Sequence, residues 1–312
     1  MRKLILSLLL LVLAGGLAAF ILWAGQRPSA HYLSDLRSAI TGAQPPAQPG
    51  ANLLLLRPQL FALDYQSPAH LRLKLAAALN QARAAGLLRP NTLVVLPEHI
   101  GTWLIARDEK VEFYRARSRK EVRDWLLLGN PWLAVKVLLL NLNAQRLDEA
   151  LLRMKAERMA EDYQQLFSGL AREYRITLLA GSILLPEPRV ENGRLLSGQG
   201  PLRNLSLVFA PDGSLLGAPY SEAWPWRPGS DAPQRFMHAG QQWTVMRDWR
   251  PGYPQSIVQL PDGRSSAPLF LRGKLSWPIG GAPRAVELTP SRIPQASEAP
   301  GSHLLNLWFD QP

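Results

Sequence analysis

The sequence predicts a mixed α/β domain behind a single apolar N-terminal helix, and three observations predict it. Two short apolar runs, NLLLLR at 52–57 and TLVVLPE at 92–98, have the pattern of strands buried on both faces. An amphipathic helix pattern separates them, which makes a β-α-β unit with parallel strands. A long uncharged run, at 4–24, precedes both strands.

This uncharged run has the length of a membrane span. Arg2 and Lys3 precede it, and Trp23 stands where an interfacial aromatic residue belongs. A cleaved signal peptide is the alternative, but its apolar region is usually shorter, and the following GQRPS is a poor cleavage site. We expect residues 1–25 to form an uncleaved transmembrane anchor in the lipid bilayer. The basic N-terminus predicts a bacterial inner-membrane protein whose globular part faces the periplasm.

Composition excludes several classes of protein. Among 312 residues, 47% are apolar, so the chain can bury a core. The net charge of +11 comes from scattered arginines rather than a basic stripe, so we expect a surface beside anionic lipid and no nucleic-acid partner. The absence of cysteine excludes disulfides and thiol catalysis. The histidines lack metal-ligand spacing, so we expect no metal and no cofactor.

The stretch at 26–50 is polar and proline-rich and ends in AQPPAQPG, which is typical of a linker. The globular domain is therefore expected at 51–312. Its first helix should start at Ser67-Pro68, where serine can cap the free amides, and end at Gly86.

Further elements follow in order. Apolar residues at helical spacing predict a long helix over 147–174, which leads into a strand, ITLLAGSI, at 176–183. Pro211-Asp212-Gly213 predicts the turn of a hairpin. A second turn of this kind lies at 259–264, and HLLNLWF at 303–309 is the closing strand.

The segment at 125–142, WLLLGNPWLAVKVLLLNL, is strongly apolar and broken by Gly-Asn-Pro. One interpretation is a loop that dips into the membrane beside the anchor. The other is a buried helix or an oligomer contact. The sequence does not separate them.

Four features in order resemble the nitrilase (carbon–nitrogen hydrolase) superfamily. A first buried strand and helix come first. They lead to LVVLPEHIG, which is similar to the family's strand that ends in proline and the catalytic glutamate and points to Glu98. A long helix before LLAGSI is similar to the family's helix and strand ending in Gly-Ser. The hairpin from Asn204 through Pro211-Asp212-Gly213 to Tyr220 is similar to the family's asparagine-led hairpin. The resemblance covers 51–226 and implies an α-β-β-α sandwich of the nitrilase type.

The family's chemistry needs three groups. A cysteine thiolate attacks a nitrile or amide carbon, a glutamate moves the protons, and a lysine stabilises the developing charge. In this chain the resemblance puts Glu98 at the glutamate position and Glu222 at the lysine position, which reverses the charge there. WTVMRDWRPGYP, at 243–254, is the nearest match to the cysteine strand, with Met246 in the cysteine place and Asp248 two residues on. A thioether has no proton to lose and cannot be that nucleophile.

After Pro254 little chain is left for the helix and strand that follow the nucleophile in the family. The sandwich is therefore expected to be shortened, or completed by a partner chain. We therefore expect that the chain can associate with a partner protein or form a homo-oligomer.

Several residues keep two interpretations. Glu98 is either a surviving general base or a relic held by a buried hydrogen bond, and His99 is expected to be structural. Asp248 and Glu222 could join Glu98 in a carboxylate site. Four tryptophans could line an acyl-chain site, face the membrane or simply pack in the core: Trp224, Trp226, Trp243 and Trp249.

The leading functional hypothesis is a membrane-anchored family member that kept the fold, lost catalysis and acts as a binding or scaffolding domain. The alternative is an active hydrolase or N-acyltransferase with a non-cysteine mechanism that uses Glu98. A third hypothesis is a membrane-associated structural protein whose resemblance to the family is accidental.

Overall fold

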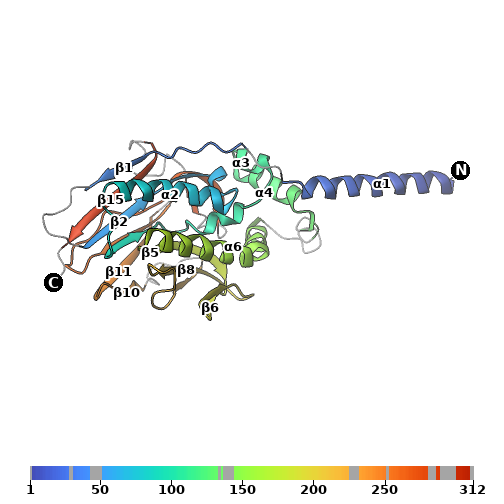
Figure 1. Cartoon of the computed structure of the whole chain (residues 1–312). Coiled ribbons are helices and arrows are strands. Elements are labelled where there is room, and N and C mark those ends of the chain that lie inside the picture. The colour runs from blue at the N-terminus through green and yellow to red at the C-terminus, as the bar shows by residue number, and fades with distance from the viewer. Residues whose placement is uncertain are drawn as a thin grey trace.

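The protein is a mixed α/β domain with a long N-terminal helix that projects from one end (Figure 1). The computed structural model describes residues 2–27, 31–42, 51–132, 135, 144–224, 232–250, 253–279, 286–288 and 300–309.

The described helices are α1 (Arg2–Gly25), α2 (Pro68–Ala84), α3 (Val111–Arg115), α4 (Arg119–Gly129) and α6 (Ala144–Tyr174), with short 3-10 helices η1 (Ala62–Tyr65) and η2 (Thr102–Ala106). The first eight strands are β1 (Ser38–Thr41), β2 (Ala51–Arg57), β3 (Gln59–Phe61), β4 (Thr92–Val95), β5 (Thr177–Pro186), β6 (Arg189–Glu191), β7 (Arg194–Leu196) and β8 (Leu202–Phe209). The others are β9 (Tyr220–Ala223), β10 (Gln234–His238), β11 (Gln241–Arg250), β12 (Tyr253–Gln259), β13 (Arg272–Ile279), β14 (Val286–Leu288) and β15 (Ser302–Phe309).

A seven-stranded sheet in the order β1-β15-β2-β4-β5-β8-β9 organises the domain. Strands β2, β4 and β5 run parallel, with Leu53 opposite Leu93 and Val94 opposite Leu178. The predicted β-α-β unit is therefore confirmed. All the residues of these three strands are buried, as expected for a parallel sheet covered on both faces.

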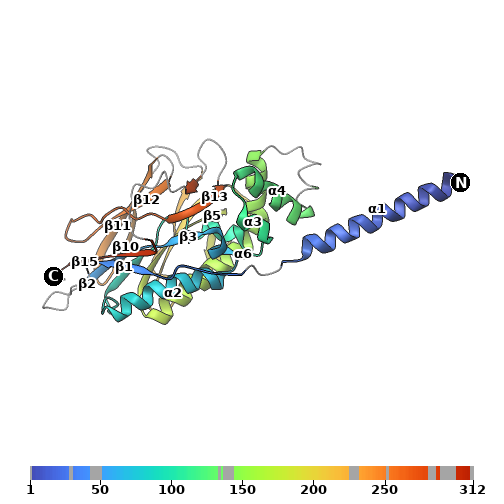
Figure 2. The same ribbon diagram turned by 90° about the horizontal axis from the view of Figure 1, so that it is seen from above.

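The two faces of this sheet belong to different apolar cores. Leu54 of β2 packs in a core shared with α2 and α6, whereas the next residue, Leu53, packs in a core shared with the small sheet β10-β11-β12. This follows from the alternation of side chains along a strand. The described residues thus form three layers: helices, large sheet and small sheet (Figure 2).

Local sequence signals set the ends of α2. The hydroxyl of Ser67 accepts from the amide of His70 at 3.2 Å, Pro68 is the first helical residue, and Gly86 has φ 70° just beyond the end. The predicted start and end of this helix are confirmed. The predicted long helix is α6, and the Pro211-Asp212-Gly213 turn leads out of β8 as expected.

The C-terminal strand β15 lies between β1 and β2, antiparallel to β2. Its partner β1 falls in the stretch that the sequence assigned to the linker. Tyr32, in the same stretch, stacks on His70 with ring centroids 3.7 Å apart and donates to Asp64 at 2.7 Å. Residues 31–42 therefore pack on the domain, because strand pairing and one aromatic contact compensate for their polar composition. The proline-rich 43–50 lies outside the described residues.

Helix α1 is long and apolar enough to cross a membrane, a property that transmembrane spans and signal sequences share. Its last turn is held on the domain. The Lys110 ammonium donates to the carbonyl groups of Trp23 at 2.6 Å and Gln26 at 3.1 Å, and it lies 3.9 Å from the centre of the Trp23 ring. Contacts of this kind fix the direction in which α1 leaves the domain.

The apolar segment at 125–142 is described only in part. Its first residues belong to α4, where Leu126 is buried and Leu128 is 41% exposed. Trp132, just beyond, is 77% exposed. Most of the remaining segment lies outside the described residues, so both interpretations of it remain open.

The described part of the chain after β11 consists of strands and turns. It turns back as β12 and then reaches β13 and β15, with the second predicted turn closed by a hydrogen bond from the amide of Leu260 to the carbonyl of Arg264 at 2.8 Å. Met237 and Met246, on the outer face of the small sheet, are exposed. No described helix covers them.

Candidate functional site

Glu98 lies just beyond β4, where the chain passes close to a bulge in β5. At this bulge Gly181 has φ 70°, and a Cβ there would lie 2.2 Å from the carbonyl oxygen of Pro97. The amide of His99 donates to the Ser182 hydroxyl at 2.8 Å, and the amide of Gly101 donates to the Ser182 carbonyl at 2.9 Å. A glycine in β5 therefore allows the close approach that fixes the backbone around Glu98.

Both oxygens of the Glu98 carboxylate have a partner within the protein. One oxygen lies 3.0 Å from Nε of Arg247, and the other accepts from the Asn204 amide at 3.2 Å. The Ser182 hydroxyl is close enough to lower the pKa of this carboxyl group. Glu98 is 3% exposed, so these groups replace water around it.

Glu222 joins the same cluster. It lies opposite Asn204 in the β8–β9 pair, and the Asn204 amide donates to Glu222 at 3.0 Å as well as to Glu98. The Tyr220 hydroxyl donates to the second Glu222 oxygen at 3.3 Å. The structure thus brings the predicted Glu98 and Glu222 together, with one asparagine amide between them.

Arg247 is the cation of this cluster. Its side chain is 1% exposed, its Nη2 donates to Gln234 at 2.8 Å, and its guanidinium lies 4.0 Å from the centre of the Tyr220 ring. Because the side chains of a strand alternate, Arg247 shares the inner face of β11 with Trp243 and Val245.

Met246 points the other way. It is 39% exposed on the outer face of β11, so it is not part of the cluster. Met246, which the resemblance put in the cysteine place, therefore does not reach Glu98. The residue of β11 that reaches Glu98 is Arg247, one position further along, because the pleat of the strand turns Met246 outward.

The structure describes the side chains of only some of the other predicted residues. Trp224 makes an edge contact with the His99 ring at 5.1 Å, and Trp243 packs in the core between the two sheets. Trp226 lies outside the described residues, and the side chains of Asp248 and Trp249 do as well. Whether Asp248 joins the two glutamates therefore stays a prediction.

Two opposing effects act on the Glu98 carboxyl group. Burial alone would raise its pKa, but the Arg247 guanidinium, the Ser182 hydroxyl and the Asn204 amide stabilise the anion more strongly, and the net pKa lies below the ordinary value. A carboxylate with a lowered pKa is a weak base near neutral pH. The arrangement therefore favours a structural anion over a proton acceptor.

His99 is held neutral beside it. Burial lowers its pKa to about 4, with Arg247 acting in the same direction and Glu98 opposing. Its Nδ1 lies 3.0 Å from the Thr102 hydroxyl, and its backbone has φ 59°, a conformation that is uncommon outside glycine. These contacts agree with the structural role expected for His99.

Sequence analysis missed Arg247, although a signal was present. In WTVMRDW, arginine is in phase with tryptophan and valine, so a strand places a charge on the apolar face. A buried arginine needs an anionic partner. Only the fold could identify Glu98 as that partner, because 149 positions separate them in the chain.

No metal site accompanies the cluster: among the described residues, no group of three or more histidine, aspartate or glutamate side chains could hold an ion. No protein-family model matches this chain, and no curated protein sequence matches it.

The buried ion pair predicts a large stability effect. Arg247→Met should lower the free energy of unfolding at pH 7 by roughly 3–5 kcal/mol, because it leaves a buried carboxylate without its cation. Urea unfolding of the full chain in detergent micelles measures this. The difference in unfolding free energy between Arg247→Met and the wild type should be smaller at pH 5, because the unpaired Glu98 carboxyl group can take up a proton there.

Glu98→Gln combined with Arg247→Met should be more stable than Arg247→Met alone, since the uncompensated charge is gone. The matched control is Arg189→Met, which breaks the exposed Arg189–Glu191 pair and should cost less than about 1 kcal/mol. If Arg247→Met and Arg189→Met lowered the free energy of unfolding equally, Arg247 would not be the buried counter-ion of Glu98.

The low pKa of His99 predicts a pH dependence of stability. Between about pH 6.5 and 4 only the unfolded state takes up a proton at this residue, so stability falls as pH falls. Urea unfolding should show a loss of about 2 kcal/mol from this residue between pH 6.5 and 5. His99→Asn should flatten the slope, and asparagine tolerates the positive φ.

Proposed function

We propose that this chain is a membrane-anchored, non-catalytic domain of the nitrilase type that acts by binding or scaffolding. The single observation that carries the proposal is the buried pair between Glu98 and Arg247. The position that resembles the catalytic glutamate is occupied by a carboxylate whose charge is already neutralised by the protein itself.

The surroundings of this pair support the proposal. Two cavities of the described structure, of ≈ 540 Å³ and ≈ 230 Å³, are lined by other residues, and neither reaches Glu98. Glu222 adds a second carboxyl group where the resemblance calls for a lysine, and an anion there would oppose an oxyanion rather than stabilise it. No thiol exists anywhere in the chain.

The arrangement of elements is consistent with a shortened sandwich. Helices, a large sheet and a small sheet stack in the order α-β-β, and the outer face of the small sheet is exposed at Met237 and Met246. In a nitrilase-type sandwich this face carries a second helical layer. We propose that a partner protein or a second copy of the chain covers it.

We also propose that α1 remains attached and spans the bacterial inner membrane, with the domain in the periplasm. The basic residues Arg2 and Lys3 at its start support this orientation. The contacts of Lys110 with the last turn of α1 favour an anchor, since they hold the helix on the folded domain.

A direct assay tests the loss of catalysis. The purified full chain should release no ammonia from simple amides or nitriles, and intact-mass measurement should find no acyl adduct after incubation with an activated acyl ester. Glu98→Gln combined with Arg247→Met provides the matched comparison, because it removes the carboxylate while avoiding an unpaired buried charge. This double variant should keep the cellular role that deletion of the chain abolishes. An adduct present in the wild type and lost in the double variant would instead establish a catalytic mechanism that uses Glu98.

The absence of cysteine makes topology simple to test. Arg194→Cys introduces the only thiol in the chain at an exposed position, in the β6–β7 hairpin. In intact spheroplasts it should react with a membrane-impermeant maleimide. Arg2→Cys, at the opposite end of α1, should react only after the membrane is permeabilised. The reverse pattern, or a mature chain lacking residues 1–25, would refute the proposed orientation or the uncleaved anchor.

A further inference from the structure

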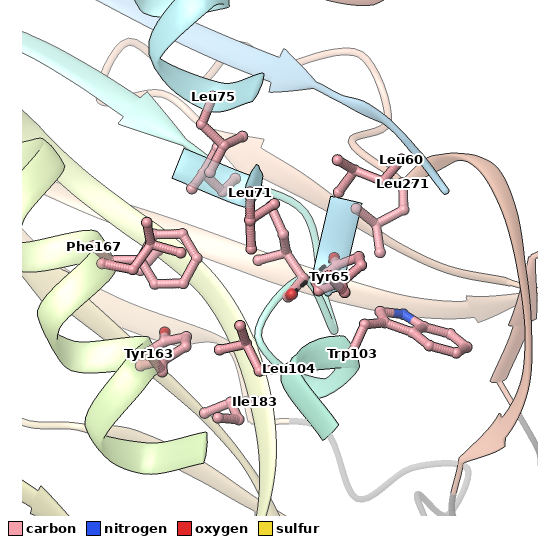
Figure 3. Close-up of a cluster of buried hydrophobic side chains, with 14 of the residues drawn as sticks. Leu60, Tyr65, Leu71, Leu75, Trp103, Leu104, Tyr163, Phe167, Ile183 and Leu271 are labelled. Atoms are coloured by element: carbon pink, nitrogen blue, oxygen red, sulfur yellow. Dashed lines mark hydrogen bonds between the residues drawn. The ribbon is translucent and has the colours of Figure 1, made fainter. Parts of the chain in front are cut away.

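A second cavity lies away from the Glu98 cluster, between η1, η2, α3 and α4. Its volume is ≈ 230 Å³. Its lining is mostly aromatic or aliphatic and includes Tyr65, Trp103, Phe113, Tyr114, Val122 and Leu275. The volume lies below the range usual for drug-sized ligands, so the cavity suits one narrow apolar group. Figure 3 shows Tyr65 and Trp103 at one end of the apolar cluster, away from Tyr163 and Phe167.

One donor in this lining has no partner. The Trp103 side chain belongs to a residue that is 2% exposed, yet its indole N–H meets no acceptor within the described part of the chain. A buried tryptophan N–H usually finds an acceptor. The indole nitrogen itself has no accessible surface, so a ligand oxygen in the cavity would supply the acceptor once the ring tilts toward it.

Two cations stand at the same cavity. Arg115 and Arg117 both line it and are exposed, and neither guanidinium has a hydrogen-bond or ion-pair partner among the residues that the structure describes. No acidic residue lines the cavity. Two exposed guanidinium groups and one buried N–H without a partner therefore adjoin an apolar space, which complements an anion with an apolar body.

The cavity lies at the end of the domain from which α1 projects. Helix α4 supplies Val122 to the lining and contacts α1, and Arg27, just past α1, donates to the carbonyl of Gly129 at the end of α4 at 2.5 Å. Figures 1 and 2 show α3 and α4 beside the C-terminal end of α1, where it joins the domain, in both views. With α1 in a bilayer, the mouth of the cavity would lie near the lipid headgroups.

We propose that this cavity binds an anionic amphiphile with a single alkyl chain. The chain occupies the aromatic lining, and the carboxylate or phosphate head accepts hydrogen bonds from the Trp103 indole and the two arginines. The proposal does not depend on whether the Glu98 cluster is inactive, because the two sites share no residue.

Isothermal titration calorimetry of the full chain in phosphatidylcholine nanodiscs tests the site with decanoate. Decanol and decyltrimethylammonium serve as neutral and cationic probes of equal chain length, and empty nanodiscs give the background from partitioning. Decanoate should bind saturably above this background, and the other two probes should not.

Three variants test the residues. Trp103→Phe should weaken decanoate binding roughly fivefold, the loss expected for one hydrogen bond. Arg115→Ala combined with Arg117→Ala should weaken it by roughly tenfold or more, as charge-assisted contacts are lost. Ala116→Trp, which fills the cavity from its half-exposed rim, should abolish binding. Arg194→Ala is the control, since it removes an exposed arginine in a different hairpin.

Equal binding of decanoate and decanol would overturn the proposal, and so would full affinity in Ala116→Trp. Thermal unfolding of each variant shows whether it folds, and the Trp103→Phe and double arginine variants decide the matter if Ala116→Trp does not. Nanodiscs that contain lysophosphatidylglycerol, an anionic lipid with one alkyl chain, distinguish the source of the ligand. Competition by this lipid identifies a bilayer lipid, and undiminished decanoate affinity identifies a free acid.

Discussion

The ion pair between Glu98 and Arg247 joins the two sheets of this domain. Glu98 follows a strand of the large sheet, and Arg247 belongs to the small sheet, so the pair forms only when the layers stack in the observed register. Both side chains are almost fully buried, which makes either charge costly without the other. Asn204 extends the same network to Glu222. The same ion pair therefore stabilises the layered fold and occupies the Glu98 carboxylate.

The chemical consequence concerns what Glu98 can still do. A general base must reach a proton on its substrate and must have a pKa near the working pH. Because Glu98 is buried, its carboxylate does not reach a substrate proton. Its pKa lies below the ordinary value and therefore farther from a neutral working pH. A domain with such a site can still bind partners. The aromatic cavity near α1, with its two exposed arginines, shares no residue with the buried pair.

Much of the element order follows from local signals in the sequence. Ser67 caps α2 because its hydroxyl accepts a free amide, and Pro211-Asp212-Gly213 turns the chain because glycine adopts the positive φ required there. Polar composition was a poorer guide between 31 and 42. Tyr32 holds that stretch on the domain through His70 and Asp64, a contact with residues more than thirty positions away that no local pattern could reveal.

By itself the sequence determined the apolar N-terminal helix, the parallel β-α-β unit and the absence of a thiol nucleophile, because each depends on residue types or on short-range periodicity. It also selected Glu98 and Glu222. Only the tertiary structure decided that these two carboxyl groups meet at Asn204, and that Arg247 rather than Met246 faces them. The pleat of β11 turns alternate side chains inward, and the stacking of the sheets determines what they meet.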